Sequence, residues 1–227
     1  MNFGLSTQTR GVFTTRENYM AVAKAAERAG FDFLAVSDHL VVPASLQSRY
    51  PYAEGGVFGA AEHGHCFDQL ATIAFLSGCT DRLRLLTSVL VVPHRPAVLT
   101  AKMLATIDVL SNGRLILGTG AGWMKEEFEL LGAPFEDRGK ATDEYLQAFR
   151  ELWTKDRPFY AGEHVSFSDV LFYPKPCKNR IHPSGSAAKV LPPCAARSGS
   201  AMPGTPAATT RRNLSTLPRA LRRASPI

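Results

Sequence analysis

Short apolar runs and longer amphipathic segments alternate along most of the chain. Short apolar runs are typical of strands, and apolar residues three to four positions apart are typical of helices. The first pair is a strand at residues 1–7 and a helix at 15–30, in which Tyr19 and Ala23 share one face and Gly30 marks the C-terminal stop. The sequence therefore begins as a β/α unit.

The same pattern repeats three more times, which predicts a parallel sheet covered by helices. An open doubly wound sheet and half of an eight-stranded barrel share this order. We expect the barrel, because the glycine-rich GTGAG follows the fourth strand, whereas a dinucleotide fingerprint follows the first. The predicted fold is α/β, a partial TIM-type (β/α)8 barrel of about four units. The remaining strands are predicted at 31–40, 82–92 and 114–122, and the remaining helices at 66–80, 96–113 and 137–154.

Composition divides the chain into two parts. All 20 acidic residues lie within residues 1–169, whereas 10 of the 26 Lys and Arg residues lie in 170–227, so the net charge of +6 comes from the C-terminal part. We expect a single domain over residues 1–182 and a basic, disordered tail over 183–227, whose Ala/Pro/Ser/Arg-rich composition cannot form a core. The tail has no aromatic residues among its arginines, so no specific nucleic-acid partner is expected.

Targeting and redox signals are weak. The N-terminus lacks the charged start and apolar run of a signal peptide, and no apolar stretch reaches the roughly 20 residues that span a bilayer. We expect a cytoplasmic protein with no membrane partner. The cysteines form no C-x-x-C pair, so free thiols are expected at Cys66, Cys79, Cys177 and Cys194.

Asp38 and His39 end the second predicted strand, where a barrel places its reactive groups. Histidine exchanges protons near neutral pH, and an adjacent carboxylate would hold its tautomer. We therefore predict that Asp38 and His39 are catalytic. In the alternative interpretation, Asp38 caps the following loop and His39 only packs there.

Two other polar groups are interpreted as structural. HGHCFD at residues 63–68 contains metal-ligating residue types, but it lies in a loop without a second ligand pair, so no metal site is expected. Glu126, Glu127 and Glu129 open a short helix, where negative charge suits the helix dipole. We expect these acids to be solvated.

Four segments carry a family resemblance: VSDHL, LLTSVLVVP, LATIDVLSNGRLILGTGAGWMKEEFELLG and RGKATDEYLQAFRELW. They resemble the luciferase-like monooxygenase superfamily, and most closely its coenzyme F420-dependent oxidoreductase branch. The resemblance covers residues 1 to about 180. It implies hydride transfer between a small organic substrate and coenzyme F420, with an FMN-dependent monooxygenase as the alternative. A homodimer of the parent enzyme is left open.

The resemblance also implies roles for particular residues. His39 would help bind the deazaflavin or exchange a proton near its reactive carbon. The third strand would carry a bulge with a non-prolyl cis peptide behind the ring, for which Ser88–Val89 is the candidate; the alternative is an ordinary buried strand. Glycines on the fourth strand allow a flat ligand to approach the backbone. The expected cofactor-binding residues are Thr87, Ser88, Val89, Gly120, Ala121, Gly122 and Trp123.

The tail departs from the resemblance in an ordered way. After the motif PKP, family members continue with Ile-Trp-Ile-Gly-Gly, then Leu-Arg-Arg-Ala and Gly-Asp-Ala-Trp, and none of these is present. Shifting the codons by one base permits the three segments in order, at residues 184–188, 194–197 and 201–204. We hypothesise that the chain is C-terminally truncated by a frameshift near residue 183. The product as written would then be an inactive partial barrel.

Overall fold

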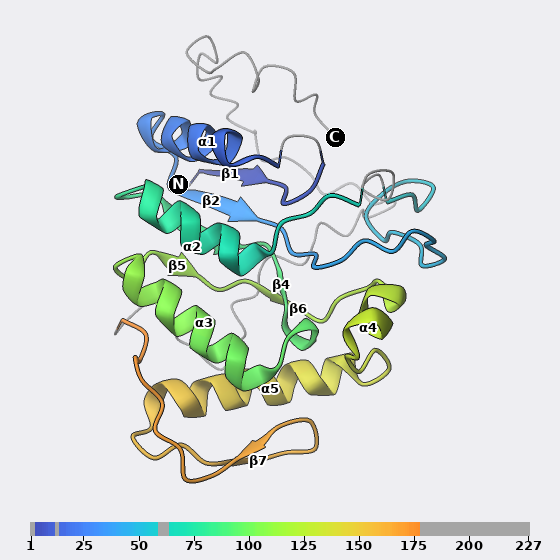
Figure 1. Ribbon diagram of the computed structural model, residues 1–227, viewed down its shortest axis with the longest axis vertical. Helices are drawn as coiled ribbons and strands as arrows, with labels where there is room; N and C mark the ends of the chain where they lie inside the picture. Colours follow the sequence, from blue (N-terminus) through green and yellow to red (C-terminus); the bar gives the residue numbers. More distant parts are fainter. Residues whose placement is uncertain (1–2, 12–13, 59–63, 178–227) are drawn as a thin grey trace, which may run out of the picture.

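The computed structural model describes residues 3–11, 14–58 and 64–177. Four parallel strands form one sheet in the order β1-β2-β3-β5, with helices between consecutive strands. This is the partial TIM-type barrel that the alternation predicts (Figure 1). The tail predicted over residues 183–227 and the proposed frameshift lie outside the described residues. The units comprise β1 (Gly4–Thr7), α1 (Arg16–Arg28), β2 (Phe33–Val36), α2 (Gln69–Cys79), β3 (Arg84–Thr87), α3 (Ala97–Leu110) and β5 (Leu115–Ile116).

Local capping explains where the helices begin and end. The Thr15 side chain accepts a hydrogen bond from the Asn18 N–H at the start of α1, and Gly30 has a φ of 76° after its end, as predicted. Asn112 and Gly113 both have positive φ, and the Gly113 N–H donates to the Asp108 carbonyl at 2.8 Å. These two residues therefore close α3 as the sequence indicates.

The third and fourth predicted strands are each interrupted. β3 is followed by a separate two-residue strand, β4 (Leu90–Val91), and β5 by β6 (Thr119–Gly120). β4 pairs with β6 in parallel, apart from the main sheet. The Ser88–Val89 peptide bond between β3 and β4 is cis, which confirms the expected position.

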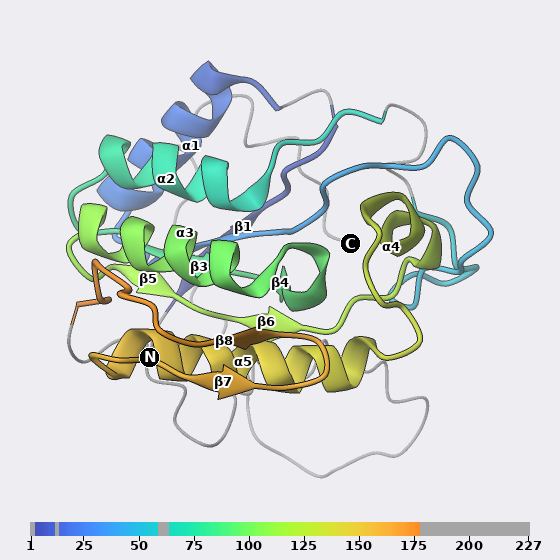
Figure 2. The same ribbon diagram turned by 60° about the horizontal axis from the view of Figure 1, so that its bottom comes forward.

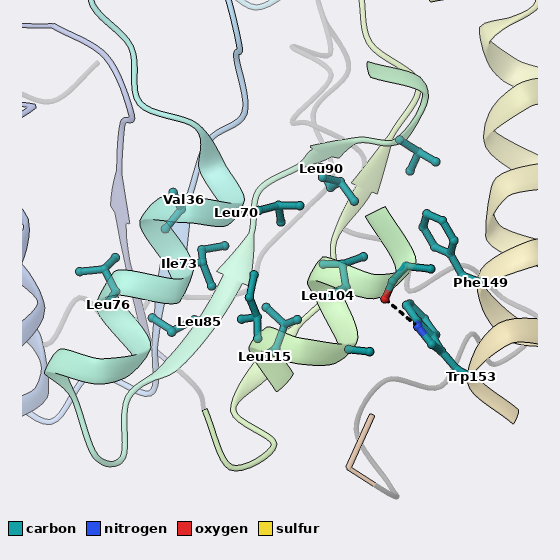
Figure 3. Close-up of a cluster of buried hydrophobic side chains, with 14 of the residues drawn as sticks. Val36, Leu70, Ile73, Leu76, Leu85, Leu90, Leu104, Leu115, Phe149 and Trp153 are labelled. Atoms are coloured by element: carbon teal, nitrogen blue, oxygen red, sulfur yellow. Dashed lines mark hydrogen bonds between the residues drawn. The ribbon is translucent and has the colours of Figure 1, made fainter. Parts of the chain in front are cut away.

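The core lies between the sheet and the helices that cover one of its faces. Leu34, Val36, Leu85 and Leu115 point from three strands toward α2 and α3, and all are fully buried. Figure 3 shows Val36, Leu85 and Leu115 beside side chains of α2 and α3, with Phe149 and Trp153 of α5 (Arg138–Thr154) next to α3. The Trp153 indole N–H donates to a carbonyl of α3 at 3.1 Å. Burial of this apolar surface stabilises the packing of helices on sheet.

The remaining elements extend the described region at its C-terminal side. A short helix, α4 (Lys125–Leu131), precedes α5, and a hairpin of β7 (Tyr160–Ala161) and β8 (Ser166–Phe167) runs along α5 (Figure 2). No helix in the described ranges has the length and apolarity to cross a membrane. The three described cysteines, Cys66, Cys79 and Cys177, are free thiols as expected.

Candidate active site

The carboxyl ends of the parallel strands meet at one edge of the sheet, which is the edge where barrels of this type carry their chemistry. In Figure 1 the strand arrows point toward α4 and the loop that follows β2. Segments far apart in sequence meet there: the end of β2, the cis peptide, the glycine-rich segment after β5, and the start of α4. The predicted site residues are therefore brought to one region.

Asp38 belongs to a buried ionic network. Its side chain is fully buried and accepts hydrogen bonds from both terminal nitrogens of Arg95: Nη1 donates to Oδ2 at 2.9 Å, and Nη2 donates to Oδ1 at 2.8 Å. Its Oδ2 also accepts the Val91 N–H at 2.9 Å, and Arg95 continues to Asp68 at 2.7 Å. Burial by itself would lower the pKa of Arg95, but the bonds and charges of Asp38 and Asp68 raise it. Asp38 thus fixes the end of β2 against β4.

His39 takes its partner from α4. The Glu127 carboxylate lies 2.8 Å from His39 Nδ1. The Asp38 carboxylate instead accepts its hydrogen bonds from Arg95 and the Val91 N–H. The prediction that Asp38 would hold the tautomer of His39 is therefore wrong. The alternative, in which His39 only packs, does not describe this hydrogen bond to a carboxylate either.

Glu127 itself corrects a second prediction. Instead of being solvated at the helix start, it is fully buried, and its Oε1 accepts the N–H groups of Leu40 at 2.7 Å and Val41 at 3.2 Å. Burial by itself would raise the pKa of Glu127, but the hydrogen bond and charge of His39, the charge of His94 and the Leu40 N–H lower it. The carboxylate is thus held in its ionised form.

Glu126 holds the same loop further along, which again differs from the prediction. Its Oε1 accepts the N–H groups of Gln47 at 2.7 Å and Ser48 at 2.9 Å. Burial by itself would raise the pKa of Glu126, but the Ser48 side chain and nearby backbone N–H groups lower it to about 2. We call these two acids and the backbone N–H groups that they bind the Glu126–Glu127 clasp. Glu129 is exposed, as predicted.

Aromatic side chains surround the His39 ring. The ring centre of the buried Phe58 lies 4.9 Å from that of His39, and the Trp123 ring lies edge-on with its centre 6.3 Å away. Tyr50 packs against both Phe58 and Trp123, and the Arg10 guanidinium lies 4.5 Å from the Phe58 ring centre. The loop held by the clasp therefore places a largely apolar cluster beside the one histidine that ends a strand of the described sheet.

The cis peptide and the glycine-rich segment form an adjoining surface. Ser88 is exposed and Val89 half-buried, and Gly120 lies so close that an added Cβ would be 2.6 Å from Val89 Cγ2. Gly122 has a φ of 86°, and a Cβ there would be 2.6 Å from the Phe128 ring. Both glycines therefore let the neighbouring side chains of Val89 and Phe128 pack directly against the backbone of this segment.

Thr87 has a different place from the one predicted. It is fully buried, and its hydroxyl donates to the Gly118 carbonyl at 2.7 Å and accepts the Gly118 N–H at 2.8 Å. Thr87 therefore joins the strands below the surface. Contact with a cofactor is expected of Ser88 and Val89 instead.

The residues of HGHCFD that the structure describes have separate partners. His65 is hydrogen-bonded to the Thr14 hydroxyl, and the Cys66 thiol donates to the Leu40 carbonyl at 3.4 Å. Asp68 caps α2 through the Ala71 N–H and pairs with Arg95. His63 lies outside the described residues. The segment thus connects α2 to the ionic network.

The comparison with protein families decides the identity of the fold. The model of the family described as luciferase-like monooxygenase matches residues 1–217. The chain belongs to this family. The match includes the domain boundary expected at residue 182, and that boundary stays a prediction.

Known relatives of this luciferase-like chain are longer. An uncharacterized protein of Mycobacterium tuberculosis (strain H37Rv) is 35% identical over 184 residues, which are 80% of this chain and 63% of the relative. An FMNH(2)-dependent dimethylsulfone monooxygenase of Pseudomonas putida is 32% identical, over 71% of this chain and 40% of the relative. The luciferase-like chain thus spans less than two thirds of these relatives.

A solved structure supports the same fold. An F420-dependent secondary alcohol dehydrogenase, in complex with an F420-acetone adduct, has a TM-score of 0.58 and 20% identity, over 79% of this chain and 51% of that chain. The family and its neighbours are oxidoreductases and monooxygenases, and they include users of both FMN and F420.

Sequence reasoning missed Arg95 and Gln69 as well as Glu127. Gln69 is fully buried at the start of α2, and its amide donates to the Val36 carbonyl at 2.7 Å and to the Val89 carbonyl at 3.4 Å. Gln69 therefore connects the end of β2 to Val89 of the cis peptide bond. A polar residue just after a helix N-cap carries no signal of this role.

Proposed function

We propose that the luciferase-like barrel to which this chain belongs is a deazaflavin-dependent oxidoreductase, which transfers a hydride between a small organic substrate and coenzyme F420. FMN-dependent monooxygenation is the alternative. The observation that carries the proposal is the meeting of the Ser88–Val89 segment, the Gly120–Gly122 segment and His39 at the strand ends. The exposed Ser88 and the small residues 120–122, close to one buried, hydrogen-bonded histidine, suit a flat redox ring and a proton donor or acceptor.

The residues divide the work in this proposal. When bound, the flavin or deazaflavin ring supplies the two-electron chemistry. Ser88, Val89, Gly120 and Gly122 would support its face, with Ala121 and Trp123 at its rim. His39 would take or give the proton at the substrate oxygen, and Phe58 with Trp123 would keep water away from it. Asp38 would act by holding the end of β2.

Binding experiments test the proposal with the full 227-residue chain. We expect quenching of F420 fluorescence on titration, with weaker quenching of FMN. The F420 signal should be lost in Gly120→Leu, because its Cβ would lie 2.6 Å from Val89 Cγ2 and displace the Ser88–Val89 segment. The Gly139→Ala variant, at an open helical position, is the control. A folded chain that binds neither cofactor nor the isolated ring system would overturn the proposal.

A second candidate function concerns this polypeptide rather than the parent barrel. The chain spans 63% of a relative's length, and barrels bind the cofactor phosphate with loops of their last strands. The 227-residue chain would then be inactive. Binding of the isolated ring system, lumichrome or a deazaflavin without its phosphate tail, together with absence of turnover, would support this candidate.

A further inference from the structure

We infer that Glu127 is the positioning residue of His39: it keeps the proton of the neutral imidazole on Nδ1, so that Nε2 presents a lone pair toward the site. The catalytic meaning of this inference rests on the proposed function. The tautomer itself does not, because it follows from contacts within the chain.

One carboxylate binds three consecutive residues. Oε2 of Glu127 lies 2.8 Å from His39 Nδ1, while Oε1 accepts the N–H groups of Leu40 and Val41. The side chain of His39 is 8% exposed and that of Glu127 is 0% exposed. The imidazole ring and the backbone that carries it are therefore fixed to the same group.

The charge of Glu127 decides which atom donates. His39, His94 and the Leu40 N–H keep the pKa of Glu127 below its usual value, against the effect of burial, so the group is a carboxylate. An ionised carboxylate only accepts hydrogen bonds, and Nδ1 must therefore be the donor in this contact. In a neutral imidazole the other nitrogen is then an acceptor.

The second nitrogen is available for chemistry. Nε2 of His39 has no hydrogen-bond partner within the described part of the chain, and the ring lies against Phe58 and near Trp123. Nε2 can accept a proton from a substrate hydroxyl in oxidation and return it in the reverse direction. Asp38 cannot replace Glu127 in this role, because Arg95 and Val91 occupy its carboxylate.

Glu127→Gln separates positioning of the ring from support of the loop. The amide oxygen of glutamine can still accept the Leu40 and Val41 N–H groups, but its NH2 group would then face His39 Nδ1 as a donor. The neutral ring must respond by moving its proton to Nε2. A residue that only held the loop would leave the tautomer unchanged.

The test is the ring-nitrogen spectrum of His39 in the 15N-labelled 227-residue chain, recorded where the ring is neutral and assigned by loss of its signals in His39→Asn. We expect a protonated Nδ1 and an unprotonated Nε2 in the wild type, and the reverse in Glu127→Gln. Glu126→Gln, which alters the neighbouring loop contact, is the matched control and should leave the pattern unchanged. A wild-type ring protonated at Nε2 overturns the inference, even if Glu127→Gln does not fold.

The catalytic part has its own readout. If the chain or its full-length relative turns over F420, Glu127→Gln should lower kcat by roughly 10²-fold or more with little change in KM, as expected when a base is held in the wrong tautomer. Unchanged kcat with a reversed tautomer would remove the catalytic role and leave the positioning intact. Absence of cofactor binding would contradict the proposed function alone, since the spectrum needs no cofactor.

Discussion

Arg95 is a buried cation that pairs with two carboxylates. Its side chain is 7% exposed, and it faces the fully buried carboxylate of Asp38 and the half-buried one of Asp68. Such a pair stabilises little relative to apolar packing, but loss of one partner leaves a buried charge without compensation. The network is therefore fragile toward single substitutions.

We predict that Arg95→Met lowers the free energy of unfolding by about 3–5 kcal/mol. The physical reason is that Asp38 would keep only the Val91 N–H as a partner. Urea denaturation followed by circular dichroism measures the change. Arg157→Met is the control, because Arg157 and Asp169 form an exposed pair that contributes roughly 0–1 kcal/mol. Equal effects of the two substitutions would contradict the assignment.

Gly122 is required by two independent features. Its φ of 86° is unfavourable for other residues, and a Cβ would be 2.6 Å from the Phe128 ring and 2.8 Å from Val91 Cγ1. We predict that Gly122→Ala destabilises the protein by roughly 2 kcal/mol or more. Gly78→Ala, in α2 with open space around it, should instead stabilise by roughly 0.5–1 kcal/mol. Thermal unfolding of both variants provides the comparison.

At the scale of elements, α4 and the loop after β2 behave as one unit. Glu126 and Glu127 open α4, and their carboxylates bind backbone N–H groups at two points of the loop. The loop also supplies Tyr50 and Phe58 to the aromatic cluster. Its conformation therefore determines what lies beside His39.

We predict that Glu126→Ala releases the loop at Gln47 and Ser48. Amide hydrogen exchange at these two positions should become roughly 10-fold faster or more, because each loses a bond to a charged acceptor. Glu129→Ala is the matched control, since Glu129 lies on the same helix and makes only a 3.9 Å contact with Lys125. Unchanged exchange at Gln47 would show that the clasp does not order the loop.

The clasp also predicts a dependence on acid. The pKa of Glu126 is lowered from 4.5 to about 2 in the folded chain, so its ionised form stabilises the fold above pH 4.5. This contribution is lost as the pH falls from 4.5 toward 2. The stability difference between wild type and Glu126→Gln should therefore shrink across this window, as measured by urea unfolding at several pH values. A difference that grows as the pH falls would contradict this origin.

The order of strands and helices could be predicted because apolar periodicity is a local property. The break in the third strand could be expected at Ser88–Val89 only from the family resemblance, because residues 86–92 contain no glycine or proline. The break depends on pairing, with the Leu90 N–H donating to the Gly118 carbonyl. His39 could be chosen as a strand-end histidine. Its partner is 88 residues away in sequence, and no local pattern connects Glu127 to it.

At the scale of the whole molecule, the described sheet is open. β1 pairs only with β2, and β5 pairs only with β3, so both outer strands of the described sheet have one unpaired edge. Parallel sheets of this kind are normally covered on both faces and closed or flanked at their edges. The covered face contacts α1, α2 and α3.

We predict that the 227-residue chain self-associates in a concentration-dependent manner through these edges. Sedimentation velocity should show a weight-average mass above the 24.7 kDa of one chain, rising with concentration. Added charges on the β1 edge, as in Ser6→Lys, should reduce the association, whereas Lys24→Glu on the outer surface of α1 should not. A monomer at all concentrations would contradict the prediction.

The carboxylates of the Glu126–Glu127 clasp bind backbone N–H groups between residues 40 and 48, and these contacts do not depend on which side chains those residues carry. An attachment of this kind survives most changes in loop sequence, since every residue except proline offers the same N–H group. Tyr50 and its neighbours can therefore be exchanged while the backbone contacts that orient His39 are kept. The orientation of His39 is thus insulated from sequence change in the loop that lies beside it.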